Sequence, residues 1–439
     1  MSPRTYSEST SDNSYTGRPS GEMSLYQGSM SSSETNKYRL RMWVDEEYNP
    51  QGDGGSLAFS VKVNVYGKAG DKMSVKDQIL AANPLQEEKE KMFNYTSNGY
   101  YVVSETSYGL QTEKDPNYVT KGLYSMEDED GISYYFRGDI DNNNVQFGEY
   151  ESDYYVYSPD NYMYFQSLES CQQYSSSCSE SNRVKLASKG DKMYWKIVRI
   201  NGDGSLRLIY NGTSTTPDNS NLSNSFKVGK SPYNLKEDEQ KYVGYTYDNG
   251  TDSFVKREVD IWYQNTLGSS SYDSSVIEGR FCSDSSGYKK ASEYGFINEY
   301  RSKDMYYSST GKRLGGRLKT TKTDNNPTLI CPETSETYGG SYRLKAGLIT
   351  ADELVLAGEN YLLVGESYYL QGYMNDFWTM TPAMFITSHA IAGVWVHNEY
   401  DDTGYAASGL SSLRPVINVK ADNFTSGFGT SSNPYVIEV

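Results

Sequence analysis

Three apolar runs near the C-terminal end place the strongest constraint on the fold of this chain. They are Phe377–Pro382, Gly393–His397 and Leu413–Val419, with polar segments between them. Short runs rich in β-branched and aromatic residues, separated by Ser, Gly, Asp and Asn, are typical of strands joined by polar loops. The Arg414-Pro415 pair of the third run cannot lie mid-ladder in a central strand, because proline has no N–H to donate. The sequence therefore predicts three strands here and limits how the third is paired.

The clearest hairpin in the sequence lies between Tyr194 and Tyr210. Tyr194–Ile200 alternates between polar and apolar residues, and Leu206–Tyr210 follows as a partner strand. Asn201–Gly204, between them, reads Asn-Gly-Asp-Gly, which is a tight-turn sequence.

A second hairpin is predicted from Tyr134–Arg137 and Val145–Phe147, around the polar segment Asp139–Asn144. An EF-hand calcium loop counted from Asp139 would need Gly at its sixth position and Glu at its twelfth. The chain has Asn144 and Tyr150 there. We therefore expect an Asx-rich turn rather than an EF-hand.

Helical signals are fewer. Val255, Val259 and Trp262 recur at the spacing that puts them on one face of a helix. Thr350 precedes Asp352 and Glu353, which indicates an N-capped helix with acidic residues in its first turn.

The composition limits the classes of protein to which this chain can belong. Hydrophobic residues make up 36% of the 439 residues and mean hydropathy is −0.72, yet the chain has 43 tyrosines. Disordered chains lack aromatic residues, so we expect an ordered, β-rich protein that relies on tyrosine for apolar area. The net charge of −16 disfavours nucleic acid and anionic membranes as partners, since both need clustered Lys and Arg. No apolar run approaches the length of a spanning helix.

The four cysteines are predicted to form two disulfides. Cys171 with Cys178, and Cys282 with Cys331, each bracket a flexible polar loop that a cross-link would restrain. Free thiols and a zinc site are the alternatives. No spacing gives the C-x₂₋₄-C unit of common zinc sites.

The C-terminal runs also resemble a known family. Trp-Thr-Met-Thr-Pro, then Val-Trp-Val, then Leu-Arg-Pro-Val-Ile-Asn-Val is similar to the C-terminal half of C-type-lectin-like domains. The resemblance is to the branch shared by formylglycine-generating enzymes, the variable proteins of diversity-generating retroelements, and secreted gut-Firmicute surface proteins. The 194–213 hairpin and Gly122–Gly138 are similar to the last of these. The resemblance covers residues 120–439 and implies an α+β, mainly antiparallel fold with insertions.

This gives a predicted domain plan. Residues 1–36 are a flexible or extended Ser-rich arm, and residues 37–70 a small β-rich segment that weakly resembles the end of a camelysin-like β-sandwich. Residues 71–119 form a helical linker, in which Ser74 and Asp77 begin a helix and Pro84 divides it. The C-type-lectin-like domain occupies 120–439, with an insertion at 149–189.

The sequence gives little support for an enzyme. Formylglycine-generating enzymes use cysteines close to the C-terminal strands, whereas no cysteine follows Cys331. A Ser/His/Asp hydrolase would have to use His389 or His397, with Asp401 or Asp402 near the latter, and no G-x-S-x-G elbow is present. We therefore predict a protein that is not an enzyme, and a divergent enzyme on the same fold is the third-ranked alternative.

In C-type-lectin-like folds, the segments between the last strands form the ligand face. The corresponding loops here are Asn375-Asp376, Thr387–His389 and His397–Leu410. Aromatic rings cover the apolar face of a sugar while carboxylates and amides accept its hydroxyls. The predicted ligand-binding residues are Trp395, His397, Asn398, Tyr400, Asp401, Asp402 and Tyr405. No resident cofactor is expected, with calcium a weak possibility.

The predicted function is non-catalytic binding of a glycan or protein ligand outside the cell or at the cell wall, with the export signal not in this chain. The main alternative is a structural subunit of a surface fibre or matrix that assembles by strand exchange through residues 1–70.

Overall fold

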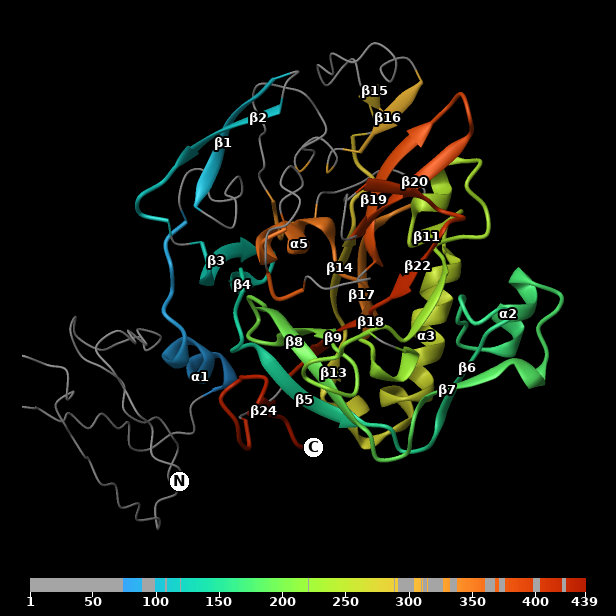
Figure 1. Cartoon of the computed structure of the whole chain (residues 1–439), viewed down its shortest axis with the longest axis horizontal. Coiled ribbons are helices and arrows are strands. Elements are labelled where there is room, and N and C mark those ends of the chain that lie inside the picture. The colour runs from blue at the N-terminus through green and yellow to red at the C-terminus, as the bar shows by residue number, and fades with distance from the viewer. Residues whose placement is uncertain are drawn as a thin grey trace, which may run out of the picture.

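The computed structural model describes residues 74–88, 99–106, 109–118, 120–219, 221–287, 289–290, 304–308, 310, 314, 327–331, 338–359, 368–370, 376–397, 403–420 and 424–439. The predicted arm at 1–36 and the β-rich segment at 37–70 lie outside these residues. The described part is an α+β protein whose sheets are mostly antiparallel, as predicted (Figure 1). None of its helices is long and apolar enough to cross a membrane.

The helices are short, and side-chain caps begin them. The α-helices are α1 (Val75–Ala82), α2 (Leu168–Tyr174), α3 (Phe254–Asn265) and α5 (Ala351–Ala357). Short 3-10 turns occur at η2 (Glu180–Asn182), η3 (Leu222–Asn224), η4 (Gln240–Val243), η5 (Leu267–Ser269) and η6 (Ser271–Ser274). The predicted caps are confirmed: the Ser74 side chain accepts a hydrogen bond from Asp77 N, and Thr350 forms a capping box with Glu353.

Nine strands form the larger sheet. They are β3 (Gly122–Asp128), β4 (Gly131–Arg137), β5 (Asn144–Glu149), β8 (Lys192–Ile200), β9 (Leu206–Tyr210), β13 (Val276–Ile277), β18 (Ala346–Gly347), β23 (Val416–Val419) and β24 (Tyr435–Val436). The main path runs β13-β23-β9-β8-β4-β3, with β5 beside β8 and β24, and β18 beside β23. The predicted 194–210 hairpin is confirmed as β8 and β9.

Seven strands form the second sheet. They are β10 (Gly229–Pro232), β15 (Lys289–Lys290), β16 (Met305–Tyr307), β19 (Phe377–Ile386), β20 (Ile391–His397), β21 (Thr403–Ala406) and β22 (Leu410–Leu413). Four two-stranded pairs complete the described strands: β1 (Tyr100–Thr106) with β2 (Gly109–Lys114), β6 (Tyr154–Tyr157) with β7 (Arg183–Ala187), β11 (Thr246–Tyr247) with β12 (Thr251–Asp252), and β14 (Gly279–Ser283) with β17 (Gly340–Leu344).

The Arg414-Pro415 pair is where the chain passes from one sheet to the other. β22 ends at Leu413 in the seven-stranded sheet, and β23 begins at Val416 in the nine-stranded sheet. The single strand predicted over 413–419 is therefore wrong, because the proline divides it into two. The buried Arg414 guanidinium lies 4.4 Å from the centre of the Phe226 ring and donates from Nε to the Tyr210 carbonyl at 2.9 Å. This contact ties the crossover to β9.

The second predicted hairpin is also wrong. β4 and β5 do not pair with each other, because both pair with the same edge of β8. Tyr134 of β4 lies opposite Ile200, while Asn144 of β5 lies opposite Lys196. β8 is nine residues long, so it has room for both strands end to end.

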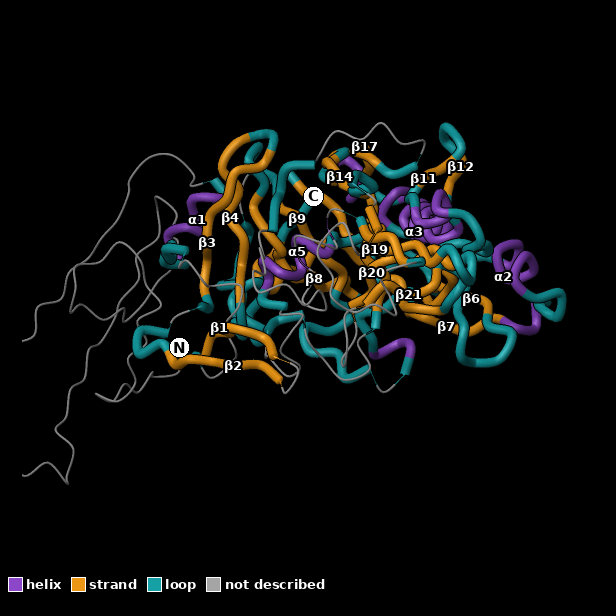
Figure 2. Tube along the Cα trace, turned by 90° about the horizontal axis from the view of Figure 1, so that it is seen from above, coloured by secondary structure: helices purple, strands orange, loops and turns teal. Residues whose placement is uncertain are grey.

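The helical linker predicted at 71–119 is correct only for α1. Residues 100–106 and 109–114 instead form β1 and β2, which pair as a two-stranded sheet of their own (Figures 1 and 2). The run Tyr-Tyr-Val-Val-Ser at 100–104 has the β-branched and aromatic residues that favour strands.

The main core lies where α3 packs on the nine-stranded sheet. Val255, Val259 and Trp262 of α3 are buried, as their spacing predicts. The Trp262 ring lies 6.2 Å from that of Trp195 and 5.4 Å from that of Tyr210, both in edge-to-face contact. Aromatic rings thus supply much of this core.

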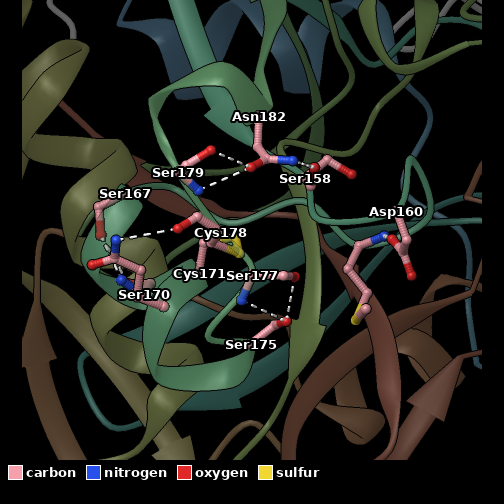
Figure 3. Close-up of a disulfide and its surroundings, with 12 residues drawn as sticks. Ser158, Asp160, Ser167, Ser170, Cys171, Ser175, Ser177, Cys178, Ser179 and Asn182 are labelled. Atoms are coloured by element: carbon pink, nitrogen blue, oxygen red, sulfur yellow. Dashed lines mark hydrogen bonds between the residues drawn. A yellow bond between two sulfur atoms is a disulfide. The ribbon is translucent and has the colours of Figure 1, made fainter.

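Residues 150–191 form a lobe that projects beside α3 (Figures 1 and 2). It contains β6, β7 and α2, and it joins β5 to β8, two strands that pair directly. The Cys171–Cys178 disulfide lies in this lobe, and Figure 3 shows the serines and Asn182 around it. Asn182 donates to the Ser158 carbonyl at 3.2 Å, which ties the disulfide loop to the end of β6.

Candidate ligand-binding face

The predicted ligand residues lie on and around the β20–β21 hairpin. β20 and β21 are antiparallel, with Trp395 opposite Gly404 and Val394 opposite Tyr405. Trp395, His397 and Tyr405 belong to the described strands. Asn398, Tyr400, Asp401 and Asp402 lie outside the described residues, so their part in a site stays a prediction.

Trp395 lies in the core rather than on the surface. Its exposed fraction is 6%, and it belongs to a cluster with Ala351, Val355 and Ala383. A cavity of about 10 Å³ beside it offers space on the scale of one water molecule. In this conformation the Trp395 ring is therefore not a stacking surface for a ligand.

His397 is buried in a polar group at the end of β20. Its Nδ1 hydrogen bonds to the Glu359 carboxylate, and its exposed fraction is 3%. The Tyr368 hydroxyl lies 3.2 Å from Glu359 Oε1 and 3.1 Å from His397 Nδ1. Among the described residues, the carboxylate that orients His397 belongs to Glu359. This group fixes the end of β20.

Tyr405 is the exposed member of the described set. Its exposed fraction is 46%, and its ring lies 6.0 Å from the fully buried Trp378. Trp378 is held in turn by a 2.8 Å hydrogen bond from Nε1 to the Ser231 carbonyl and by the Tyr233 ring at 5.5 Å. Tyr405 therefore presents a ring to solvent on a rigid aromatic support.

A carboxylate lies close to the β21–β22 turn that follows Tyr405. The Glu237 side chain accepts hydrogen bonds from the backbone and hydroxyl of Ser408, and its carbonyl accepts from Ala392 N at 2.7 Å. The exposed Leu235 belongs to the same segment, which joins β21 through a 2.9 Å bond from Asn234 N to the Ala407 carbonyl. The segment with Leu235 and Glu237 thus lies against the turn that follows Tyr405.

Two of the segments that carry the family resemblance, 122–138 and 194–213, meet α5 elsewhere, in a buried ion network. Arg199 of β8 lies 2.8 Å from Asp128 and 3.1 Å from Glu353, and Arg207 of β9 pairs with the same Glu353. Burial alone would raise the pKa of Glu353, but Arg207 and Arg199 hold it below its ordinary value. Because its charges are already paired, the network joins α5 to the sheet rather than awaiting a ligand.

A cavity of about 30 Å³ adjoins this network. The Cys282–Cys331 disulfide, Arg280 and Glu129 line it together with the ion network. The volume suits a couple of water molecules and is far below that of a ligand pocket. Both disulfides have the predicted pairing.

The sequence did not predict the polar contacts between the 150–191 lobe and the seven-stranded sheet. The Lys230 ammonium lies 3.9 Å from the centre of the exposed Tyr162 ring and 3.7 Å from the Asp376 carboxylate. Asp376 is part of a predicted ligand loop, whereas Tyr162 comes from the insertion. No sequence signal connects the two, because β10 brings them together.

The polar turn at 139–144 is anchored to the C-terminal segment. The Asp141 carboxylate accepts from Ser431 N at 3.0 Å and from the Ser431 hydroxyl at 2.8 Å. Within the described ranges, no three His, Cys, Asp or Glu side chains come together as a metal site would require. His389, the second histidine, lies in an exposed turn with the Ser388 hydroxyl 2.9 Å from its Nδ1.

Comparisons of the chain with protein-family models, with curated proteins and with solved structures find no match. The resemblance to C-type-lectin-like domains accordingly stays a prediction.

Proposed function

We propose that this chain is a non-catalytic extracellular protein that binds a glycan or protein ligand through the face around Tyr405, at the β20–β21 edge of a C-type-lectin-like domain. The observation that carries the proposal is the half-exposed Tyr405 ring on its buried Trp378 support. A ring whose position is fixed before binding loses little entropy when a ligand stacks on it.

The chemistry of the face favours a glycan over a purely apolar ligand. The Tyr405 ring can cover the C–H face of a sugar, and the Glu237 carboxylate can accept its hydroxyls. The two disulfides support a place outside the reducing cytosol. Asn398, Tyr400, Asp401 and Asp402 would extend this face from the neighbouring loop.

The test is binding of the full chain to a panel of glycans and mucins, with and without EDTA. Tyr405→Ala removes the ring, and Tyr100→Ala is the matched control because Tyr100 is a comparably exposed tyrosine on the separate β1–β2 hairpin. We expect binding that Tyr405→Ala weakens and Tyr100→Ala preserves. Loss of binding in EDTA would add a divalent cation to the site.

Binding that is equally strong in Tyr405→Ala would move the ligand face away from β21. Absence of binding to the whole panel, with polymerisation of the intact chain, would favour the fibre alternative. That alternative depends on residues 1–70, which lie outside the described structure, and it stays a prediction.

A further inference from the structure

Lys196 and Asn144 face each other across two paired strands. Lys196 lies in β8 and Asn144 in β5, and the antiparallel register places them directly opposite. Side chains of such partners project from the same face of the sheet, with Cβ atoms about 5 Å apart. Both are buried, with exposed fractions of 8% for Lys196 and 1% for Asn144.

The polar atoms of this pair are incompletely satisfied. Asn144 Nδ2 donates to Asp141 Oδ1 at 3.1 Å and to the Gly429 carbonyl at 2.9 Å, but its buried Oδ1 has no hydrogen-bond partner in the described part of the chain. Among the described residues, Lys196 has neither an ion pair nor a side-chain hydrogen bond. An ammonium on a largely buried side chain without a counter-charge is disfavoured, so its deprotonation is favoured.

Burial favours the neutral, nucleophilic form of Lys196. The pKa of Lys196 is lowered to about 8, chiefly by burial and to a smaller extent by the Arg414 charge, while the Asp141 charge opposes both. A lysine desolvated in this way has a substantial amine fraction near neutral pH, which is how proteins activate lysine as a nucleophile.

We propose that Lys196 and Asn144 react with each other to form an intramolecular isopeptide bond. The neutral Lys196 Nζ attacks Asn144 Cγ and forms the new C–N bond, while the carbonyl electron pair moves to Oδ1. The pair then returns, the Cγ–Nδ2 bond breaks, and one ammonia leaves. Asp141, already hydrogen-bonded to Nδ2, carries the proton from Nζ to the departing nitrogen.

The cross-link would replace an unpaired buried charge with a neutral amide. It would also join β5 to β8 at the end of β5 away from the 150–191 lobe, so that a covalent bond as well as the β5–β8 ladder would close the segment that contains the lobe. Lys196 lies in the predicted hairpin, but the sequence places Asn144 in a turn and does not connect the two.

Intact-mass spectrometry of the folded, purified chain tests the proposal. We expect a mass lower than that of the disulfide-bonded sequence by one ammonia, and a tryptic digest with one branched peptide that joins the segments containing Asn144 and Lys196. Lys196→Arg should restore the full mass. Lys192→Arg, on the same strand but exposed and paired with Glu149, should retain the loss.

A succinimide at an Asn-Gly pair would also lose one ammonia, but it would persist in Lys196→Arg and give no branched peptide. The peptide map of the unsubstituted chain decides the matter even if a variant fails to fold. Full sequence mass after prolonged incubation at pH 8 to 9, without a branched peptide, would overturn the proposal.

Discussion

The Glu353 carboxylate completes the N-terminal cap of α5 and forms a buried ion pair with Arg207 of β9. Its Oε2 accepts from Thr350 N at 3.0 Å, while Oε1 contacts both Arg207 and Arg199. The Glu353 side chain therefore connects α5 to β8 and β9. Arg199 extends this connection to Asp128 of β3.

Glu353→Gln is expected to be strongly destabilising. It leaves the buried Arg207 without its counter-charge while Arg199 keeps Asp128, and breaking a buried pair costs about 3–5 kcal/mol of unfolding free energy. Denaturant unfolding measures the loss. Asp153→Asn, which removes an exposed partner of Lys185, is the matched control and should cost much less, because solvent screens that pair. Equal effects of the two substitutions would contradict a structural role for the network.

Glu258 should make stability depend on pH. It lies buried in α3 and accepts from Gln166 N of the lobe at 2.7 Å, and burial raises its pKa to about 7. Because the folded state holds the Glu258 proton more tightly than the unfolded state, this contribution is largest below about pH 4.5. It is lost as pH rises through about 7.

Protonated Glu258 contributes up to about 3 kcal/mol to the unfolding free energy at low pH. Glu258→Gln stays uncharged, so its unfolding free energy should fall less between pH 5 and 8 than that of the unsubstituted chain. Glu169→Gln, on the exposed face of α2, is the control and should keep the original profile. Identical profiles for Glu258→Gln and the unsubstituted chain would show that Glu258 is ionised in the folded state.

The two disulfides should differ in their contribution to stability. They span 7 residues for Cys171–Cys178 and 49 for Cys282–Cys331. Loop-closure entropy then gives about 2 kcal/mol for the short loop and about 4 kcal/mol for the long one. Double Cys→Ser variants, compared by thermal unfolding, should show the larger drop in Tm for Cys282 and Cys331. The reverse order would indicate that native-state contacts outweigh chain entropy.

Elements defined by local pattern were predictable from the sequence. The Asn-Gly-Asp-Gly turn specifies the β8–β9 hairpin, and the spacing of Val255, Val259 and Trp262 specifies the buried face of α3. The caps at Ser74 and Thr350 were also predictable, because capping depends only on a few adjacent residues.

Pairing between distant segments was not predictable from these patterns. β4 and β5 read as a hairpin because they are adjacent in sequence, yet both pair with β8, whose length admits two partners. Proline at 415 predicted a limit on strand pairing, but not that β22 and β23 belong to different sheets. The carboxylate that hydrogen bonds to His397 belongs to Glu359, which lies far from it in the sequence.

The sequence predicted which types of residue form the candidate site, but not which of them are exposed to solvent. Aromatic residues near the β20–β21 loop indicated a stacking face, but alternation alone did not show that Trp395 faces the core while Tyr405 faces solvent. Glu237 and Tyr162 reach the surface through tertiary contacts that leave no local signal.

The most direct test of the central proposal is the affinity of the full chain for its best glycan from the panel, compared between Tyr405→Phe and Tyr405→Ala. If the Tyr405 ring is the stacking platform, Phe should retain affinity while Ala lowers it about tenfold, the equivalent of about 1.4 kcal/mol. Unchanged affinity in Tyr405→Ala, with its fold intact, would contradict a ligand face at β21.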